Sequence, residues 1–316
     1  MRVKKHKDSR KILIHVDVDS PLKLFDFYKL NGIEYSIEQL EKFYSISWSR
    51  ALDFFEKLNI KATFFVVGNE FESNQIIRDV ILNASNRGHE IENHTYSHPF
   101  GLAHLSDDII KEEVEKCSIL IKNLTGKDSI GFRSPGYSIN TNVINVLEDL
   151  NFKYDSSGFW SVMNPLLSIT QRFIFKNGIN HADFGGVSMK LPHNKYVPCR
   201  DNWLIKTKVK RDFNELTLPR TSLLGLPFYN NFNLWAPFIY SKIVSKSIKR
   251  DNIVYLFHII EFMDMSDDIP KELIIHPNLK IDTYKKMNRA QIILTNLMKR
   301  YEFIETRKFI ELNQNL

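Results

Sequence analysis

Hydrophobic positions near the start of the chain predict a buried strand over residues 11–21, because this stretch is apolar and β-branched. The predicted strand ends in two carboxylates, Asp17 and Asp19. Side chains two residues apart on a strand point the same way, so both acids are expected on one side at its carboxyl end. Two acids there cost stability unless they are paired or coordinate a metal. A solvated acidic loop is the alternative.

Strand-like and helix-like patterns alternate along the rest of the chain. Short apolar runs predict strands, and apolar residues three and four apart predict helices. The predicted strands span 60–67, 89–93, 129–132, 152–154, 213–218, 251–257 and 301–304. The predicted helices span 48–58, 74–87, 106–124, 141–150, 237–249 and 282–300. This alternation, at a spacing of roughly 25–35 residues, predicts βαβ units and a parallel sheet, open or closed.

Two aromatic-rich segments lack a regular period, residues 22–46 and 158–211, and both are interpreted as insertions. The first is expected to lie over the strand ends as part of a substrate wall. No low-complexity linker or short repeat interrupts the pattern. A single domain over residues 1–316 is therefore the simplest organisation, and this length suits an α/β barrel with insertions.

Composition narrows the function classes. The chain has 316 residues, 43% of them hydrophobic, a net charge of +6 and a sequence pI of about 9.0. The positive charge permits an anionic partner, but the basic residues are spread out without a stripe of interleaved aromatics, so nucleic acid is not expected. The two cysteines, Cys117 and Cys199, lie far apart and form neither a disulfide framework nor a zinc knuckle.

Targeting signals are not evident. The basic start is followed by the predicted strand with its acids and not by the apolar core of a secretion signal. No run reaches the roughly 18 apolar residues of a membrane span. We therefore expect no transmembrane segment and a cytoplasmic location.

His94 and His98 are the strongest candidate metal ligands. On a helical turn, a spacing of four places two imidazoles on one face, near enough to share a metal. Chance is the alternative, because the chain has 10 histidines. A third ligand must come from elsewhere in the fold, and the acids after the first strand offer one.

Seven polar residues each follow a predicted strand at its carboxyl end. In a barrel or doubly wound sheet these ends converge on one edge. Singly, each has a structural alternative: Arg133 as a surface ion pair, Asp155 as a helix cap, His258 as a core histidine. Together they indicate one site. The seven are Asp17, Asp19, His94, His98, Arg133, Asp155 and His258.

Five short motifs in a fixed order resemble the polysaccharide deacetylases, carbohydrate esterase family 4, also called the nodulation-factor deacetylase homology domain. They span about residues 11–260, which would form the motif-bearing core. The resemblance implies a distorted (β/α)7 barrel. The motifs are Asp17-Val-Asp19, His94-Thr-Tyr-Ser-His98, Arg133-Ser-Pro-Gly-Tyr137, Tyr154-Asp-Ser-Ser-Gly-Phe-Trp160 and Leu256-Phe-His258.

Two motifs depart from the usual family pattern. Val18 separates acids that are normally adjacent, with Ser20 in place of the Gly that follows them, and Gly136 is inserted before Tyr137. These variants resemble the branch that contains surface-polysaccharide and allantoinase-like deacetylases. The segments around Glu215 and Glu261 are similar to that branch as well. The departures bear on the substrate more than on the hydrolysis.

The residues also fit a hydrolytic mechanism. Asp19, His94 and His98 would hold one divalent metal ion, with Zn²⁺ expected first and Co²⁺, Ni²⁺, Fe²⁺ or Mn²⁺ as alternatives. The ion would polarise an amide carbonyl and activate water. Asp17 would act as general base, and Arg133 would keep it ionised.

The remaining roles concern the leaving group and the substrate. His258 would protonate the departing amine, with Asp155 holding its imidazolium. The resemblance implies a backbone N–H near Tyr137 as oxyanion donor. It also gives Trp160, Glu215 and Glu261 as candidate substrate-binding residues. Four tryptophans are available for stacking on a sugar or for the core: Trp48, Trp160, Trp203 and Trp235.

The function inferred from the sequence is metal-dependent N-deacetylation of an acetamido sugar in a bacterial surface glycan or its precursor, such as O-antigen or lipopolysaccharide. The substrate would be an N-acetylated sugar that is polymeric, lipid-linked or nucleotide-linked. Another non-peptide C–N bond, in a formamido sugar or a ureide, is the nearest alternative. A catalytically silent glycan-binding homologue is the second alternative, although all the candidate groups are present.

Overall fold

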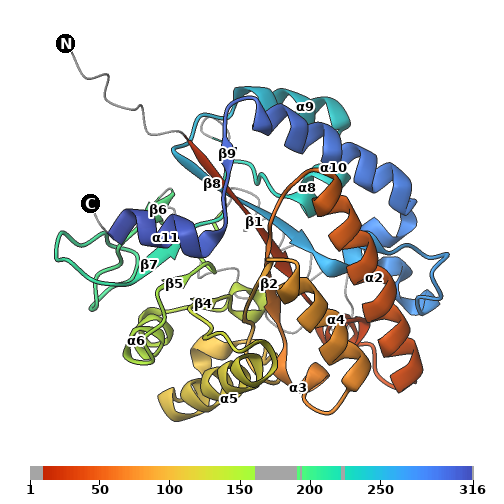
Figure 1. The fold of residues 1–316 in the computed structure, drawn as a ribbon, viewed down its shortest axis with the longest axis horizontal. Coiled ribbons are helices and arrows are strands. Elements are labelled where there is room, and N and C mark those ends of the chain that lie inside the picture. The colour runs from red at the N-terminus through yellow and green to blue at the C-terminus, as the bar shows by residue number, and fades with distance from the viewer. Residues whose placement is uncertain (1–9, 161–190, 193, 222–224, 315–316) are drawn as a thin grey trace.

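Strand β1, Lys11–Asp17, lies next to the β8 edge of the sheet and has parallel partners on both sides (Figure 1). The computed structural model describes residues 10–160, 191–192, 194–221 and 225–314. Along the sheet the strand order is β6-β7-β5-β4-β3-β2-β1-β8, and β9 adds to β1. The other strands are β2 Thr63–Val66, β3 Glu90–Asn93, β4 Gly131–Phe132, β5 Tyr154–Asp155, β6 Lys195–Tyr196, β7 Asn214–Leu216, β8 Asn252–His258 and β9 Glu302–Phe303.

The strands from β7 to β8 in this order all pair in parallel, and β6 alone runs antiparallel at the β7 edge. The two edges of the sheet lie close together. The amide of Lys195 on β6 donates to Oδ1 of Asn252 on β8 at 3.4 Å. The result is a distorted, nearly closed α/β barrel with seven parallel strands, which confirms the predicted fold class.

Helices surround this barrel as an outer layer (Figure 1). The principal ones are α2 Ile37–Lys57, α4 Gln75–Asn86, α5 Asp107–Thr125, α6 Thr141–Asp149, α9 Phe238–Ser247 and α10 Thr283–Met298. Shorter helices are α1 Pro21–Tyr28, α3 Gly68–Phe71, α8 Asn230–Trp235 and α11 Thr306–Gln314. The 3₁₀ turns are η1 Leu102–His104, η2 Pro135–Tyr137, η3 Ile259–Phe262, η4 Lys271–Ile275 and η5 Pro277–Lys280.

Alternation along β1 divides the core into two regions. Ile12, Ile14 and Val16 face outward and pack against the helices in the main hydrophobic cluster. The alternate residue Leu13 belongs to a separate cluster inside the barrel, which includes Phe65 of β2. His15 and Asp17 share this inward side and are 0% and 3% exposed. The barrel interior is therefore apolar near one end and polar toward the carboxyl ends of the strands.

Gly131 on β4 is required by close packing inside the barrel. A Cβ at this position would lie 2.0 Å from Cζ of Tyr154, whose ring fills the interior. Tyr154 itself is fully buried. The pair shows how a small residue on one strand makes room for a large ring on the next.

Residues 22–46, interpreted from the sequence as an insertion without a regular period, contain helical structure. Residues 21–28 form α1, and α2 begins at Ile37, eleven residues before the predicted start at 48. The missed signal is a capping box. The amide of Gln39 donates to Ser36 Oγ at 3.2 Å, and the Ser36 amide donates to Gln39 Oε1 at 2.9 Å.

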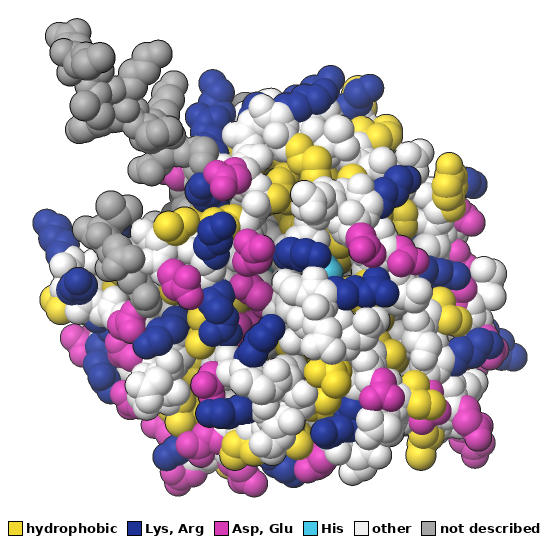
Figure 2. Space-filling model, viewed as in Figure 1, with side chains coloured by type: hydrophobic (Ala, Val, Ile, Leu, Met, Phe, Trp, Pro, Cys, Tyr) yellow, Lys and Arg dark blue, Asp and Glu magenta, His cyan; other side chains and the backbone are white. Residues whose placement is uncertain are grey.

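Several other predictions are refined by the structure. Helices α8 and α11 and strand β6 were not predicted from the sequence. Most of the second proposed insertion, 158–211, lies outside the described residues, since 161–190 and 193 are not included. Within the described ranges, none of the helices combines the length and the apolar character that crossing a membrane requires. Lys and Arg side chains alternate with Asp and Glu over the face drawn in Figure 2.

Candidate active site

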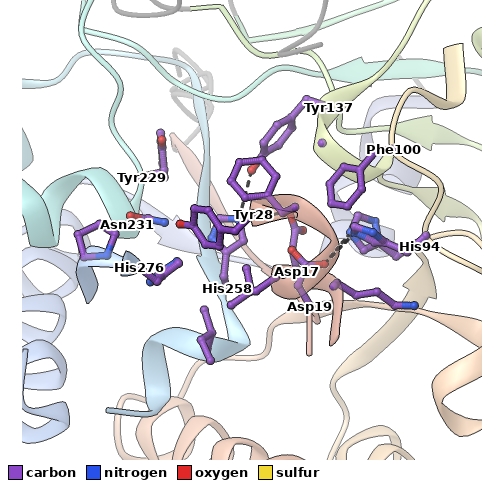
Figure 3. A pocket seen from close by; sticks show the side chains of 17 residues that line it. Asp17, Asp19, Tyr28, His94, Phe100, Tyr137, Tyr229, Asn231, His258 and His276 are labelled. Carbon is purple, nitrogen blue, oxygen red and sulfur yellow. Dashed lines mark hydrogen bonds and ion pairs between the residues drawn. The ribbon is translucent and has the colours of Figure 1, made fainter. Parts of the chain in front are cut away.

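A cavity of about 290 Å³ opens at the carboxyl ends of the barrel strands (Figure 3). It brings together Asp17 and Asp19 from β1 and the loop after it, His94 and His98 after β3, and His258 at the end of β8. The remaining lining residues are Lys23, Leu24, Phe27, Tyr28, Phe100, Gly136, Tyr137, Tyr229, Asn231, Ile260, His276 and Pro277.

Asp19, His94 and His98 form a compact triad at one side of this cavity. Nε2 of His94 lies 3.2 Å from Oδ1 of Asp19, and Nε2 of His98 lies 3.1 Å from the same oxygen. The three potential ligand atoms are all within 4.8 Å of one another. Ligand atoms about 3 Å apart suit a shared cation with bonds of about 2.1 Å.

Hydrogen bonding around the triad leaves its ligand atoms available. His94 Nδ1 lies 2.7 Å from the carbonyl oxygen of Arg133 and donates to it, which leaves Nε2 as an acceptor facing Asp19. Among the described residues, neither Asp19 Oδ1 nor His98 Nε2 has a hydrogen-bond partner although both are buried. Burial opposes ionisation of Asp19, but the two imidazoles hold the pKa of its carboxyl well below the usual range. Two nitrogens and one carboxylate oxygen match the donor set of an open, catalytic divalent-metal site.

The two histidines do not lie on a helical turn, so the rationale for their spacing is wrong. They flank an irregular loop after β3, in which Thr95 and His98 have φ angles of 65° and 64°. His98 is held by its amide, which donates to Thr95 Oγ1 at 3.0 Å. Glu113 of α5 fixes the middle of the loop, because its carboxylate accepts from the Ser97 amide at 2.8 Å and from the Ser97 hydroxyl at 2.7 Å. These hydrogen bonds hold the loop in a shape that brings the rings of His94 and His98 together.

Asp17 lies between Arg133 and His258 at the base of the cavity. The Nε of Arg133 is 3.5 Å from Oδ1 of Asp17, and both side chains are buried. On the other side, Nε2 of His258 is 3.9 Å from Oδ2 of Asp17. Figure 3 shows Asp17 and Asp19 side by side with His258 beyond Asp17 and His94 beyond Asp19. A base candidate, an acid candidate and a metal-ligand triad thus face one volume.

Glu261, and not Asp155, is the carboxylate beside His258. Nδ1 of His258 donates to Oε1 of Glu261 at 3.2 Å, and Asn230 Nδ2 donates to Oε2 of the same glutamate at 2.5 Å. Burial alone lowers the pKa of His258, but the hydrogen bond to Glu261 and the charge of Asp17 raise it to about 9. An imidazolium is therefore the stable form of His258 at neutral pH.

Asp155 has other partners, and its expected pairing with His258 is corrected accordingly. Its carboxylate accepts from the amide and hydroxyl of Ser157 at 2.8 and 2.7 Å. It also interacts with Glu215, which is fully buried. Burial and the neighbouring Asp155 raise the pKa of Glu215 well above its usual range. This acid pair supports the barrel interior beneath Arg133.

The backbone amide of Tyr137 is engaged within its own turn. It donates to the carbonyl oxygen of Ser134 at 3.0 Å, and the oxyanion donor expected near Tyr137 stays a prediction. The inserted Gly136 has a φ of 58°, a left-handed conformation that favours glycine, and it turns Tyr137 toward the cavity. The phenolic oxygen of Tyr137 lies 3.4 Å from Nε2 of His258. The phenol, and not the amide, is the polar group that Tyr137 presents beside the acid candidate.

The residues expected to bind substrate do not line the cavity. Glu215 and Glu261 are 0% exposed and bonded elsewhere, and Trp160 packs in a separate cluster with Arg220 over its ring. Trp48 is stacked on Phe64, and Trp203 is buried in the same cluster as Trp160. The side chain of Trp235 lies outside those described.

Sequence reasoning missed most of the cavity wall. The rings at the cavity come from α1, from the loop after His98, and from η2 and α8: Phe27, Tyr28, Phe100, Tyr137 and Tyr229. The location of residues 22–46 in this wall agrees with the prediction. His276 and Asn231 complete the far side (Figure 3) and follow no motif. Only their position in the folded barrel identifies them.

The parallel α/β barrel gathers acidic residues and histidines at the carboxyl ends of its strands. The family model described as polysaccharide deacetylase matches residues 41–154, a range that contains His94, His98 and Arg133. Over this range the chain is similar to the polysaccharide deacetylase family.

Curated relatives match about a third of the chain. A peptidoglycan-N-acetylglucosamine deacetylase of Bacillus cereus is 32% identical over 103 residues, 33% of this chain and 36% of that protein. A peptidoglycan deacetylase of Helicobacter pylori is 34% identical over 111 residues, 34% of this chain and 36% of that protein. The chain therefore spans about a third of the length of these relatives.

The fold is matched over its whole length by a solved structure. A Mycobacterium smegmatis protein assigned to the polysaccharide deacetylases has a TM-score of 0.61 and 15% identity. The match covers 99% of this chain and 94% of that one. At this identity the likeness shows the fold alone.

Proposed function

We propose that this protein is a metal-dependent N-deacetylase that acts on an acetamido sugar of a bacterial surface glycan or its precursor. The proposal takes residues 1–316 as one catalytic domain. The observation that carries it is the meeting of the triad of Asp19, His94 and His98 with Asp17 and His258 at a single cavity. Hydrolysis of an amide needs activated water, charge stabilisation and an acid for the amine, and this set contains groups for each.

The donor set supports a divalent cation, with Zn²⁺ first and Co²⁺, Ni²⁺, Fe²⁺ or Mn²⁺ as alternatives. Asp19, His94 and His98 would hold it through one carboxylate oxygen and two Nε2 atoms. When bound, the ion supplies Lewis acidity, which polarises an amide carbonyl and makes water more acidic. Asp19 Oδ1 and His98 Nε2 are buried and have no hydrogen-bond partner among the described residues, which supports this assignment because such atoms cost stability.

Asp17 is the proposed general base. Its carboxylate sits at the end of β1 beside Asp19, within reach of a water molecule in the cavity. The guanidinium of Arg133, whose Nε is 3.5 Å from Asp17, is fully buried and holds the Asp17 side chain in place. Asp17 would take the proton of the attacking water and keep it until the leaving group departs.

His258 is the proposed general acid. Glu261 binds its Nδ1–H, so the Nε2–H points into the cavity, where the nitrogen of the scissile amide would lie. An amine leaves poorly without a proton, and the pKa of His258, raised to about 9, keeps that proton available at neutral pH. The adjacent Tyr137 hydroxyl, 3.4 Å from Nε2, helps to fix the ring.

An aromatic wall supports a sugar substrate over a small ureide. Tyr28, Phe100 and Tyr229 line the cavity, and rings of this kind pack against the apolar faces of sugars. The inserted Gly136 and the separated acids of the first motif resemble the branch with surface-polysaccharide deacetylases. A formamido sugar or a ureide is the alternative substrate class.

Metal analysis combined with acetate release tests the proposal. Purified protein is analysed for bound metal and then offered N-acetylated sugars in free, nucleotide-linked, lipid-linked and oligomeric form. About one equivalent of a divalent ion, with acetate released from some of the sugars, is the expected result. If the protein binds metal but releases no acetate, the substrate is instead a formamido sugar or a ureide. Failure to bind metal after reconstitution overturns the assignment of the triad.

A further inference from the structure

A chain of buried hydrogen bonds runs from Arg133 down the barrel interior to helix α11. Nη2 of Arg133 lies 3.0 Å from Nδ1 of His15, and Nε2 of His15 lies 3.0 Å from Oγ1 of Thr306. Thr306 Oγ1 is 2.8 Å from Oγ1 of Thr63, whose hydroxyl reaches Oε2 of Glu90 at 2.5 Å. His15, Thr63 and Thr306 are at most 1% exposed.

The proton positions along this chain follow from its two ends. A guanidinium has no acceptor, so His15 Nδ1 must accept from Arg133 and its Nε2 must carry the proton. At the other end Glu90 accepts from the Thr63 hydroxyl, and so the Thr306 hydroxyl donates to Thr63. Every donor then points away from Arg133 toward Glu90. Burial and the charge of Arg133 lower the pKa of His15 well below its ordinary value, which agrees with a neutral ring.

Glu90 also connects the chain to the backbone of α11. Its carboxylate accepts from the amides of Thr306 and Arg307 at 3.1 and 2.8 Å, which satisfies two amides in the first turn of the helix. Phe309 and Ile310 of α11 pack in the cluster that fills the barrel interior. The helix is thereby fixed against the barrel at a defined height, and the Thr306 hydroxyl with it.

At the upper end, this chain fixes the orientation of Arg133. Nη2 donates to His15 and also lies 3.4 Å from Ser156 Oγ, so two acceptors hold that nitrogen. The guanidinium is a rigid plane, and holding Nη2 sets the direction of Nε toward Asp17, 3.5 Å away. Small rotations of the plane would change both the distance and the angle to Asp17.

We propose that His15 is a positioning residue for Arg133, and that helix α11, through Thr306, is the structural support for His15. The inference rests on the proposed function, in which Arg133 orients the base Asp17. No residue of α11 that the structure describes lines the cavity, so its contribution to turnover would pass entirely through the buried chain. His15 acts without touching the substrate.

Removing the Thr306 hydroxyl tests this inference. Thr306→Val keeps the side-chain volume and removes the partner of His15 Nε2, whereas Thr306→Ser keeps the hydroxyl. We expect kcat to fall by about 10-fold to 100-fold in the valine variant, with KM and bound metal unchanged, and to recover in the serine variant. The matched control is Thr217→Val, which removes another buried hydroxyl, one that donates to the Asn194 carbonyl at 3.0 Å.

A spectroscopic readout tests the inference without catalysis. In protein labelled with ¹⁵N at histidine and arginine, we expect His15 to be the neutral Nε2–H tautomer and Thr306→Val to shift both the His15 and the Arg133 side-chain signals. A cationic His15, an Nδ1–H tautomer, or Arg133 signals that ignore Thr306→Val would each overturn the proposal. An unchanged kcat in the valine variant would do the same. A wild-type protein that releases no acetate would instead count against the proposed function, and the spectra would still decide the role of His15.

Discussion

Asp17 and His258 are direct neighbours across the parallel pair of β1 and β8, and Nε2 of His258 lies 3.9 Å from Oδ2 of Asp17. Both residues end their strands, so the register of the pair places the proposed base and acid at the same height in the barrel. One set of strand hydrogen bonds therefore positions two opposite catalytic roles. Asp17 has Arg133 as its further partner, and His258 has Glu261. Mutations can therefore test the two groups separately.

Asp17→Asn should abolish turnover while metal binding survives. The amide keeps the shape of the carboxylate but cannot take a proton from water, and loss of a general base costs about 100-fold to 10,000-fold in rate. Acetate release measures the loss of activity, and calorimetric titration with Zn²⁺ measures metal binding by the triad. The matched control is Asp53→Asn, at an exposed aspartate on α2. Retained activity in Asp17→Asn would remove Asp17 from the role of base.

Glu261→Gln should shift the basic limb of the pH–rate profile to lower pH. His258 must carry a proton to act as an acid, so activity is lost as pH rises through its pKa. Glu261 and Asp17 raise that pKa to about 9 against the effect of burial, and removing the charge of Glu261 lowers it again. The profile of kcat/KM between pH 6 and 10 measures the shift. Glu272→Gln, at an exposed position on η4, should leave the limb in place; a limb equally unmoved in Glu261→Gln would contradict the pairing.

His98→Ala should lose the metal and, with it, activity. The variant removes one of two nitrogen ligands at a buried triad and leaves Asp19 Oδ1 with a single imidazole neighbour. Added Zn²⁺ should raise the melting temperature of the wild type, because a ligand that binds only the folded state stabilises it, and should not raise that of the variant. The control is His104→Ala, at an exposed histidine on η1. Equal stabilisation of wild type and His98→Ala by Zn²⁺ would place the metal elsewhere.

Much of the site could be predicted because its residues come at the carboxyl ends of strands, and the pattern of apolar residues predicts those strands. Asp17 and Asp19 stand two residues apart after an apolar run, and the same logic places His94, Arg133 and His258 at strand ends. A parallel barrel brings all these ends to one edge, whatever the details of its helices. Local rules therefore sufficed to bring the charged residues of the site to one edge of the barrel, but not to predict the rest of the cavity wall.

The partners of these residues could not be predicted in the same way. Whether Asp155 or Glu261 stands beside His258 depends on the path of η3, which folds back to bring a residue three positions along the chain against the ring. The sequence predicts an oxyanion donor only as a backbone N–H near Tyr137, and it does not show that the amide of Tyr137 itself donates to Ser134. His276 reaches the cavity from a segment with no periodic signal. The capping box at Ser36, in contrast, was visible in the sequence.

Glu215→Gln should flatten the dependence of stability on pH. Burial and the nearby Asp155 raise the pKa of Glu215 well above its ordinary value, so the folded protein keeps a proton that the unfolded chain has released. The free energy of unfolding of the wild type therefore falls as pH rises above the unfolded glutamate pKa of about 4.3 and on through the raised folded value.

A glutamine in place of Glu215 resembles the protonated acid and does not titrate, which removes this contribution. Melting temperatures measured from pH 5 to pH 8 should decline less in the variant than in the wild type. Glu272→Gln serves again as the control, since an exposed glutamate has little effect on this slope. Parallel curves for Glu215→Gln and wild type would show that Glu215 is ionised in the folded protein. Arg133 would then have to stabilise the charge of Glu215. The buried pair of Asp155 and Glu215 would hold one proton fewer than the raised pKa of Glu215 implies.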